Sequence, residues 1–408
     1  MKILFTVHGY KPAFKIGGPV ISVSSLAEAI TRKGHEVTVF TTNCNLDEDL
    51  DVPVNCPLDV DGVEVWYFKR YEALKDFLPF ASYLTKSIGF LYSKELGIQL
   101  DSRVSDFDIV HTHLPFIYPT YAAARAAKKA MKPLFYHQRG VLDPARLNFR
   151  SLKKRLYLKF IEKPILRYAT TLFALTQAEV KSYQALCPGA KCCVIPNGID
   201  VEKYQVREGA EQILGFPADS TVILFLGRLH PIKGADRLIE AFISVCSEFP
   251  NSYLVMAGPD EFKIEAKFRE RASEAGIINR IMFPGMVTGD EKKKLLARAD
   301  LFCLPSDAEG FSMAVLEALA SETAVMISPG CNFPEVEKAG CGIVAATDGE
   351  NMRQKIRSLL GNDAMLREMG RSGRDFVARN YSWSGIADRV IEAYTEGIQR
   401  NNLIVRKA

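Results

Sequence analysis

Residues 301–320, LFCLPSDAEGFSMAVLEALA, decide the fold of this chain. The apolar run from Leu301 to Leu304 predicts a buried strand, and a short polar loop follows it. Gly310 allows this loop the backbone angles that a close approach requires. From Met313 the pattern becomes helical, and Ser312 stands where a helix N-cap is expected. The stretch therefore predicts a strand, a loop and a helix in succession.

A strand, a glycine-containing loop and a helix N-terminus together form a site that favours anions. The unpaired amides and the positive end of the helix dipole point to the same place. Two carboxylates, Glu309 and Glu317, frame this place. Because carboxylates repel phosphate, we expect them to accept hydrogen bonds from sugar and ribose hydroxyls. The alternative is an ordinary strand, loop and helix with two exposed glutamates.

A second stretch repeats this plan earlier in the chain. Residues 221–226 predict a strand, GRLHPIKG at 227–234 a loop, and 235–242 a helix. The loop offers Arg228, which can bind a phosphate through two donors, and Lys233, which acts as a mobile point charge. A loop of this kind at the carboxyl end of a strand suits a pyrophosphate. The alternative is a solvated basic turn.

Together these motifs resemble a known family. Glu309 and Glu317, with Gly310-Phe311 and Leu316 beside them, look like the signature of retaining glycosyltransferases of the GT-B fold, family 4, also called glycosyl transferases group 1. The pattern Gly-Arg-Leu-x-x-x-Lys-Gly resembles the second motif of that family. The resemblance implies an α/β fold with two Rossmann-like doubly wound domains facing a central cleft. It also implies a C-terminal helix that crosses back to the first domain.

The domain boundaries follow from this resemblance and from the length of 408 residues, which is too long for a single core. We expect an acceptor-side domain at 1–203, a nucleotide-sugar-binding domain at 204–383, and a helix at 384–408 that packs on the first domain. The first forty residues support this plan, because strand, helix and strand there form a right-handed βαβ unit.

The resemblance assigns donor binding to both halves of the chain. In such enzymes the first glutamate contacts the hydroxyls of the donor sugar, and the second grips the ribose. Arg228, Lys233 and Glu309 are the expected catalytic residues, and the first two stabilise the departing diphosphate. The full set of expected donor-binding residues is Gly17, Gly18, Arg228, Lys233, Met286, Val287, Glu309, Gly310, Phe311, Ser312, Met313 and Glu317.

The acceptor side is expected at the ends of two strands of the first domain, because ligands of parallel sheets lie there. A strand at 108–113 ends in His113, and a strand at 133–140 carries His137 and Arg139 on one face. Relatives commonly carry a histidine near the end of this strand, facing the reacting sugar. Counting from Pro133 we expect it where Arg139 stands, so either His137 or Arg139 is the candidate for contact with the donor sugar. The alternative for each histidine is a structural role in the core.

The amino-acid composition limits the kinds of partner that this chain is expected to bind. The net charge of +4 is small for this length, and no aromatic-interleaved basic patch supports nucleic-acid binding. Residues 144–167 form a basic amphipathic segment that favours an anionic membrane surface, with a solvated basic face as the alternative. Nine cysteines without a Cys-x-x-Cys pair indicate reduced thiols. We expect a cytoplasmic location, either free or peripheral on the inner membrane face.

Neither a metal nor a cofactor is expected. Asp-x-Asp triplets occur at 49–51, 59–61 and 106–108, but they lie in variable-looking loops or just before a strand. The first-domain glycines do not form Gly-x-Gly-x-x-Gly, which leaves little support for a dinucleotide cofactor.

The sequence therefore predicts a retaining glycosyltransferase that moves a sugar from a UDP- or GDP-sugar to a hydroxyl of a glycan or lipid-linked acceptor, in surface polysaccharide biosynthesis. The alternatives are a catalytically silent nucleotide-sugar-binding protein that docks on membranes, and a GT-B epimerase.

Overall fold

The computed structural model describes residues 1–71, 91–142, 152–204, 215–217 and 219–405. The chain divides into two compact units. Unit 1 comprises Met1–Gly198 and Trp383–Ala408, and unit 2 comprises Ile199–Ser382. The first boundary lies a few residues before the expected 203/204, and the second lies next to the expected 383/384.

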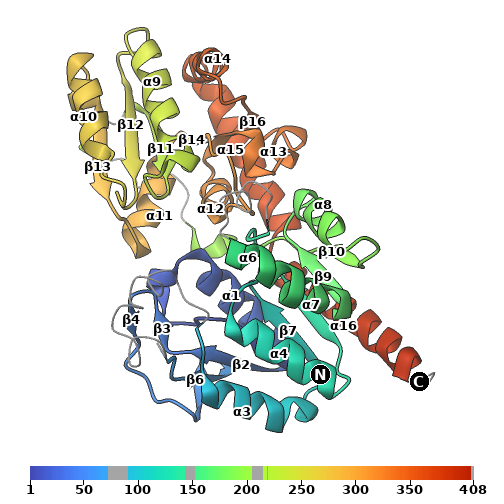
Figure 1. Ribbon diagram of the computed structural model, residues 1–408. Helices are drawn as coiled ribbons and strands as arrows, with labels where there is room; N and C mark the ends of the chain where they lie inside the picture. The colour runs from blue at the N-terminus through green and yellow to red at the C-terminus, as the bar shows by residue number, and fades with distance from the viewer. Residues whose placement is uncertain (72–90, 143–151, 205–214, 218, 406–408) are drawn as a thin grey trace. The chain divides into compact units, whose positions relative to one another are not determined.

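Unit 1 is built on an eight-stranded sheet with the order β10-β9-β8-β7-β1-β2-β6-β5 (Figure 1). All neighbours are parallel except β5 and β6, which are antiparallel. The strands are β1 (Lys2–Thr6), β2 (Glu36–Thr42), β5 (Pro57–Val60), β6 (Val63–Phe68), β7 (Ile109–His113), β8 (Leu134–His137), β9 (Thr171–Ala174) and β10 (Cys192–Val194); a separate antiparallel pair is β3 (Cys44–Asn45) and β4 (Glu48–Asp49).

Helices cover both faces of this sheet. Alternate residues of each strand point to opposite faces, and the apolar residues on both faces are buried. In β1, Ile3 and Phe5 are buried in the core beneath α1 (Gly18–Arg32) and α16 (Trp383–Val405). Leu4 is buried in the core beneath α3 (Lys94–Arg103), α4 (Tyr118–Lys129) and α7 (Lys163–Tyr168). The helices of unit 1 are η1 (Phe14–Ile16), α1 (Gly18–Arg32), α3 (Lys94–Arg103), η3 (Val104–Asp106), α4 (Tyr118–Lys129), α6 (Leu152–Tyr157), the π-helix η4 (Leu158–Glu162), α7 (Lys163–Tyr168), α8 (Gln177–Leu186) and α16 (Trp383–Val405).

The last helix, α16, belongs to unit 1 although it follows unit 2 in the chain. Its Tyr394 is fully buried and packs edge-on against Phe135 of β8, with the ring centroids 4.7 Å apart. The helix also packs against α1. The fold is therefore the predicted one in this respect: the chain crosses back to its first half at its end.

Unit 2 is built on a six-stranded parallel sheet with the order β13-β12-β11-β14-β15-β16. Its strands are β11 (Thr221–Leu226), β12 (Ser252–Ala257), β13 (Ile281–Gly285), β14 (Leu301–Leu304), β15 (Ala324–Ile327) and β16 (Gly342–Val344). Its helices are η5 (Val201–Lys203), η6 (Pro231–Lys233), α9 (Ala235–Val245), α10 (Glu265–Glu274), η7 (Ile278–Arg280), α11 (Gly289–Arg298), α12 (Met313–Ala320), η8 (Pro329–Cys331), α13 (Glu335–Lys338), α14 (Gly349–Leu360) and α15 (Asp363–Asn380).

In both sheets, successive strands of the chain are added first on one side of the first strand and then on its other side. In unit 2 the switch point, at which the side changes, lies between β11 and β14, and in unit 1 it lies between β1 and β7. Ligands of doubly wound sheets bind outside the carboxyl ends of the strands at such a point. The loops after these four strands are therefore the places to look for a site.

Over the described residues, none of the helices combines the length and the apolar character needed to span a bilayer.

Candidate functional site

The two motif loops of unit 2 leave neighbouring strands at the switch point and are bonded to each other. The hydroxyl of Ser306 and the amide of Asp307 both donate to the carbonyl of Ile232, at 3.0 and 2.8 Å. On the following helix, Arg237 binds both carboxylate oxygens of Asp307, at 2.6 and 2.9 Å. The loop after β11 and the loop after β14 therefore form one continuous structure.

The position after Lys233 requires a glycine for a steric reason. Gly234 has a φ of +70°, in the left-handed region, and a Cβ built there would lie 2.2 Å from the carbonyl oxygen of Pro305. A side chain at this position would force the two loops apart. The Lys-Gly pair of the motif is thus needed for the loops to meet.

Because the loops after β11 and β14 are bonded to each other, Lys233 and Glu309 lie close together. The Lys233 ammonium forms an ion pair with Oε1 of Glu309, and the two side chains are only 18% and 9% exposed. The backbone of Glu309 is held by the loop after β15: its amide donates to the carbonyl of Gly330 at 2.8 Å, and the side chain of Asn332 donates to its carbonyl at 2.9 Å. The pair is therefore fixed from three loops.

The start of α12 differs in one detail from the expectation. Ser312 is the N-cap residue, but its hydroxyl makes no capping hydrogen bond. The side chain of Phe311 packs on Phe333 and Tyr381, with ring centroids 5.0 and 5.8 Å apart. Phe311 therefore anchors the loop in the core of unit 2, and its predicted contact with the donor stays a prediction.

Three other predicted donor residues form no hydrogen bond or ion pair with Lys233 or Glu309 among the described residues. Arg228 is 57% exposed at its side chain and pairs with Glu261, with 3.3 Å between Nη1 and Oε2. After β13, Met286 is exposed and Val287 is buried. The structure thus places Arg228 on the motif loop, but the contacts of its guanidinium are with Glu261 and not with Glu309.

Glu317 has two partners that the sequence analysis missed. Its carboxylate is nearly buried, and its Oε1 accepts from the Lys292 ammonium at 2.7 Å and from the Tyr204 hydroxyl at 3.0 Å. Lys292 lies on α11, and Tyr204 directly follows η5. Nothing in the local sequence pattern marks either residue, because both lie far from Glu317 along the chain.

In unit 1 the loop after β1 leads to the glycine pair at the start of α1. Gly17 has a φ of +93°, and no atom lies within 4 Å of a Cβ built on Gly17 or Gly18. The buried Arg139 reaches the first turns of α1, where its Nη1 donates to the Ser22 hydroxyl at 2.9 Å and to the Asn197 side chain at 3.0 Å. A cation and a helix N-terminus therefore lie at the same edge of the sheet.

Arg139 is unusual in two ways. Its φ of +51° lies in the left-handed region, which costs a non-glycine residue about 1 kcal/mol or more. Burial lowers the pKa of its guanidinium to about 10, so the group remains charged at neutral pH. β8 ends at His137, so the strand alternation expected as far as Arg139 does not apply, and the side chain instead turns back to His113.

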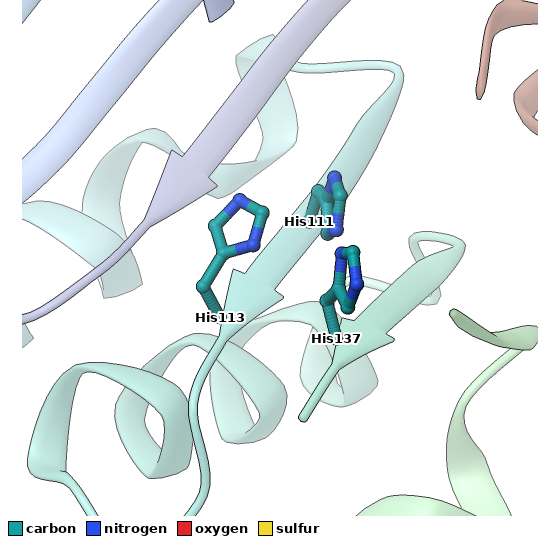
Figure 2. Close-up of side chains that lie close together, drawn as sticks. All are labelled: His111, His113 and His137. Carbon is teal, nitrogen blue, oxygen red and sulfur yellow. The ribbon is translucent and has the colours of Figure 1, made fainter. Parts of the chain in front are cut away.

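Three buried imidazoles lie beside this arginine: His111 and His113 of β7 and His137 of β8 (Figure 2). The rings of His111 and His137 stack with centroids 5.9 Å apart, and His113 is paired with His137 in the sheet register. Burial lowers the pKa of each of them well below the usual 6.5, so all three are neutral at pH 7. None is accessible enough in this structure to touch an acceptor directly, and that role stays a prediction.

The geometry alone makes these histidines a candidate metal set, because their ligand nitrogens lie within 4.8 Å of one another. The electrostatics oppose it. The Nε–H of Arg139 donates to Nδ1 of His113 at 3.3 Å, so the proton of that neutral ring is on Nε2, where it blocks ligation. The neighbouring guanidinium also repels a cation. The residues fit a neutral polar layer better than a metal site.

One carboxylate of each Asp-x-Asp triplet has a protein partner in the structure. Asp49 accepts from Arg70 at 2.5 Å, Asp61 pairs with Lys11 at 2.7 Å, and Asp108 accepts from the amide of Lys2 at 2.7 Å. These carboxylates therefore have structural roles.

Comparison with known proteins matches both units. A model of glycosyltransferase family 4 matches residues 16–203, and a model of glycosyl transferases group 1 matches residues 206–376. An uncharacterised glycosyltransferase of Methanocaldococcus jannaschii is 26% identical over 97% of this chain and 98% of its own length. A phosphatidyl-myo-inositol mannosyltransferase of Mycobacterium leprae is 28% identical over 71% of this chain and 73% of its own length.

The fold also matches solved structures. The Anabaena protein HepE, in complex with UDP and glucose, superposes with a TM-score of 0.71 at 19% identity, over 97% of this chain and all of that one. With matching family models over both units, the chain belongs to the glycosyltransferases of family 4 and group 1, which have the GT-B fold.

Proposed function

We propose that this glycosyltransferase moves a sugar from a UDP- or GDP-sugar to a hydroxyl of a glycan or lipid-linked acceptor and retains the anomeric configuration. The observation that carries the donor assignment is the Lys233–Glu309 pair at the switch point of unit 2, beside the start of α12. It offers a cation for a diphosphate and a carboxylate for sugar hydroxyls. The similar HepE structure contains UDP and glucose, which supports a nucleotide-sugar donor of this class.

The proposed chemistry is departure of the diphosphate. As the bond from the anomeric carbon to the diphosphate oxygen breaks, negative charge develops on that oxygen, and the ammonium of Lys233 with the amides at the start of α12 stabilises it. The acceptor oxygen forms the new bond to the anomeric carbon on the same face, and its proton passes to the departing phosphate oxygen. Arg228 is assigned to the same diphosphate, which requires its guanidinium to leave Glu261 when the donor binds. Glu309 orients the sugar and Glu317 the ribose. We propose that neither a metal nor a cofactor takes part, because fixed cations perform the task of a metal here.

Unit 1 is proposed as the acceptor side. Its support is the charged, buried and strained Arg139 near the N-terminus of α1, where His113 is a direct neighbour. A buried guanidinium that is held in place in this way is suited to bind an oxygen of the acceptor or of the donor that carries partial negative charge. We place the reaction at the cytoplasmic face of the membrane, in the synthesis of surface polysaccharide.

A donor panel tests the proposed function. The purified chain is incubated with UDP-, GDP- and ADP-sugars, and release of the nucleoside diphosphate is followed together with the proton NMR spectrum of the free sugar. We expect hydrolysis of a UDP- or GDP-sugar, with the α-anomer formed first from an α-linked donor. First appearance of the β-anomer contradicts retention. Failure to bind or cleave any member of the panel contradicts the function, and interconversion of the sugar without release indicates an epimerase.

We further propose that the segment from α6 to α7 docks on an anionic membrane. The support is its exposed face, where Leu156 and Phe160 are 48% and 64% exposed beside the exposed bases Lys154, Arg155 and Lys159. Its opposite side holds Ile165 and Leu166 in the core of unit 1. Apolar side chains next to bases on a surface suit a lipid interface better than water. Of the expected segment 144–167, residues 144–151 lie outside the described residues.

Vesicle co-sedimentation checks the membrane proposal. We expect the chain to bind vesicles of phosphatidylcholine with phosphatidylglycerol and to be released by salt, because each base contributes roughly 1 kcal/mol near such a surface. Phe160→Ser should weaken binding about tenfold. Met131→Ser, which removes an equally exposed apolar residue elsewhere in unit 1 (62%), is the matched control and should leave binding unchanged. Binding that does not depend on anionic lipid contradicts the proposal.

A further inference from the structure

The carboxylate of Glu317 is held on one side only. Both of its protein donors, the Lys292 ammonium and the Tyr204 hydroxyl, bind Oε1. Among the described residues, no side chain or backbone amide bonds the other oxygen, Oε2. Two donors on one oxygen fix the rotation of the carboxylate, so Oε2 is presented in a single orientation with its lone pairs unused.

The position of Glu317 on α12 suits the nucleoside part of a donor. Glu317 lies four residues after Met313, the first residue of the helix, which is one turn or roughly 6 Å along the axis. A diphosphate bound at the helix N-terminus therefore places the sugar next to it, the ribose, about one turn away. Ribose hydroxyls are donors, and Oε2 is an acceptor.

Lys292 and Tyr204 also reduce the electrostatic repulsion between Glu317 and a bound diphosphate. A lone carboxylate this close to a bound diphosphate would repel it, and Lys292 cancels that charge. The Tyr204 hydroxyl adds a neutral donor that stays protonated, because burial, and then the charge of Glu317, raise the pKa of Tyr204 above its usual value. The group that faces the ligand is thus a neutralised and oriented acceptor.

We propose that Tyr204 and Lys292 are positioning residues for nucleotide recognition, which hold Oε1 of Glu317 so that Oε2 accepts a hydrogen bond from one ribose hydroxyl of the donor. This inference rests on the proposed function and adds two residues to it. According to this inference, Tyr204, Lys292 and Glu317 together discriminate between ribonucleotide and deoxyribonucleotide donors.

Calorimetric titration of the full chain with UDP and GDP, and with the 2′-deoxy and 3′-deoxy forms of each, tests the proposal. We expect the wild type to bind one of the deoxy forms more weakly. Tyr204→Phe should weaken binding of the ribonucleotide roughly fivefold to tenfold, because an Oε2 that is no longer held in place loses most of one ordinary hydrogen bond to the ribose, worth about 1 kcal/mol. It should change binding of that same deoxy form less than about twofold, because the contact it positions is already absent. In donor hydrolysis, KM should rise by the same factor, and kcat should stay within about twofold.

Lys292→Met should weaken binding of all three nucleotides, because the charge of Glu317 is no longer cancelled, and it should reduce the preference for the ribonucleotide over that deoxy form as Tyr204→Phe does. Lys293→Met is its matched control, because Lys293 is the next residue on α11 and pairs with Asp290 instead. Equal weakening for the ribonucleotide and both deoxy forms overturns the inference, since the residues then act through the fold or another contact. Wild-type affinity in both variants overturns it as well. A wild type that binds neither UDP nor GDP overturns the proposed function, and the inference falls with it.

Discussion

Replacing Lys233 with methionine is expected to slow donor cleavage roughly 100-fold to 1000-fold, because a fixed charge aimed at a developing oxyanion contributes about 3 kcal/mol to catalysis. Methionine keeps the apolar stem of the side chain and removes the ammonium that pairs with Glu309. The measurement is the initial rate of UDP or GDP release at saturating donor.

The substitution also leaves Glu309 as an almost buried carboxylate without its cation, which by itself destabilises the fold. The double variant Lys233→Met with Glu309→Gln should recover the melting temperature, and its rate should lie well below that of Glu309→Gln alone, which keeps the ammonium. Arg237→Met is the matched control, because Arg237 pairs with Asp307 of the same loop, and it should retain the rate to within about threefold. Donor cleavage by Lys233→Met at the wild-type rate would show that this ammonium does not meet the diphosphate.

Unit 1 is expected to lose stability steeply as the pH falls from 7 toward 5. Four of its histidines are buried: His8, His111, His113 and His137. Burial lowers the pKa of His8 to about 4 and lowers the pKa values of the other three well below 6.5, with the charge of Arg139 acting in the same direction on that group.

The sign follows from proton binding. Between the folded and unfolded pKa values, the unfolded chain holds more protons, so the free energy of unfolding rises with pH. The stability is complete above pH 6.5 and is lost as the pH falls toward 4. Each histidine contributes up to about 1.4 kcal/mol per pH unit in that window, and a whole domain has only about 5 to 15 kcal/mol. We therefore expect acid unfolding of unit 1 near pH 5, before most carboxylates titrate.

Tryptophan fluorescence measures this loss selectively, because both tryptophans of the chain, Trp66 and Trp383, lie in unit 1. Urea unfolding followed in this way at pH 7.5, 6.5 and 5.5 gives the slope. His137→Phe, which replaces a ring whose two nitrogens have no partner, should reduce the slope by about one proton. His230→Gln in unit 2 should not change it. An unfolding free energy that is constant between pH 7 and 5.5 would contradict the expectation.

Much of the fold could be predicted from the sequence because its signals are local. The apolar runs at 221–226 and 301–304 are strands with those same bounds, β11 and β14. The helix after the Gly-Arg-Leu-x-x-x-Lys-Gly loop, α9, begins at Ala235 as predicted, and α12 begins at Met313 as predicted. Hydrophobic runs, prolines and helical spacing act within a few residues, so they set these bounds without help from the rest of the chain.

Local patterns also misplaced some side chains. Ser312 has the right position for an N-cap, but its hydroxyl does not make the bond. The strand predicted at 133–140 ends at His137, so strand alternation could not place Arg139. In each case the orientation of a side chain depends on neighbours from other elements, about which the local pattern holds no information.

By itself the sequence determined the family, the two motif loops and the residues that carry their charge: Lys233, Glu309 and Glu317. Only the tertiary structure decided which partners these residues meet. Tyr204 reaches Glu317 across 113 positions, and Arg139 reaches Ser22 across 117. Such pairs exist because the strand order brings distant loops to the same edge of a sheet, and that order is a property of the whole fold and not of any local spacing.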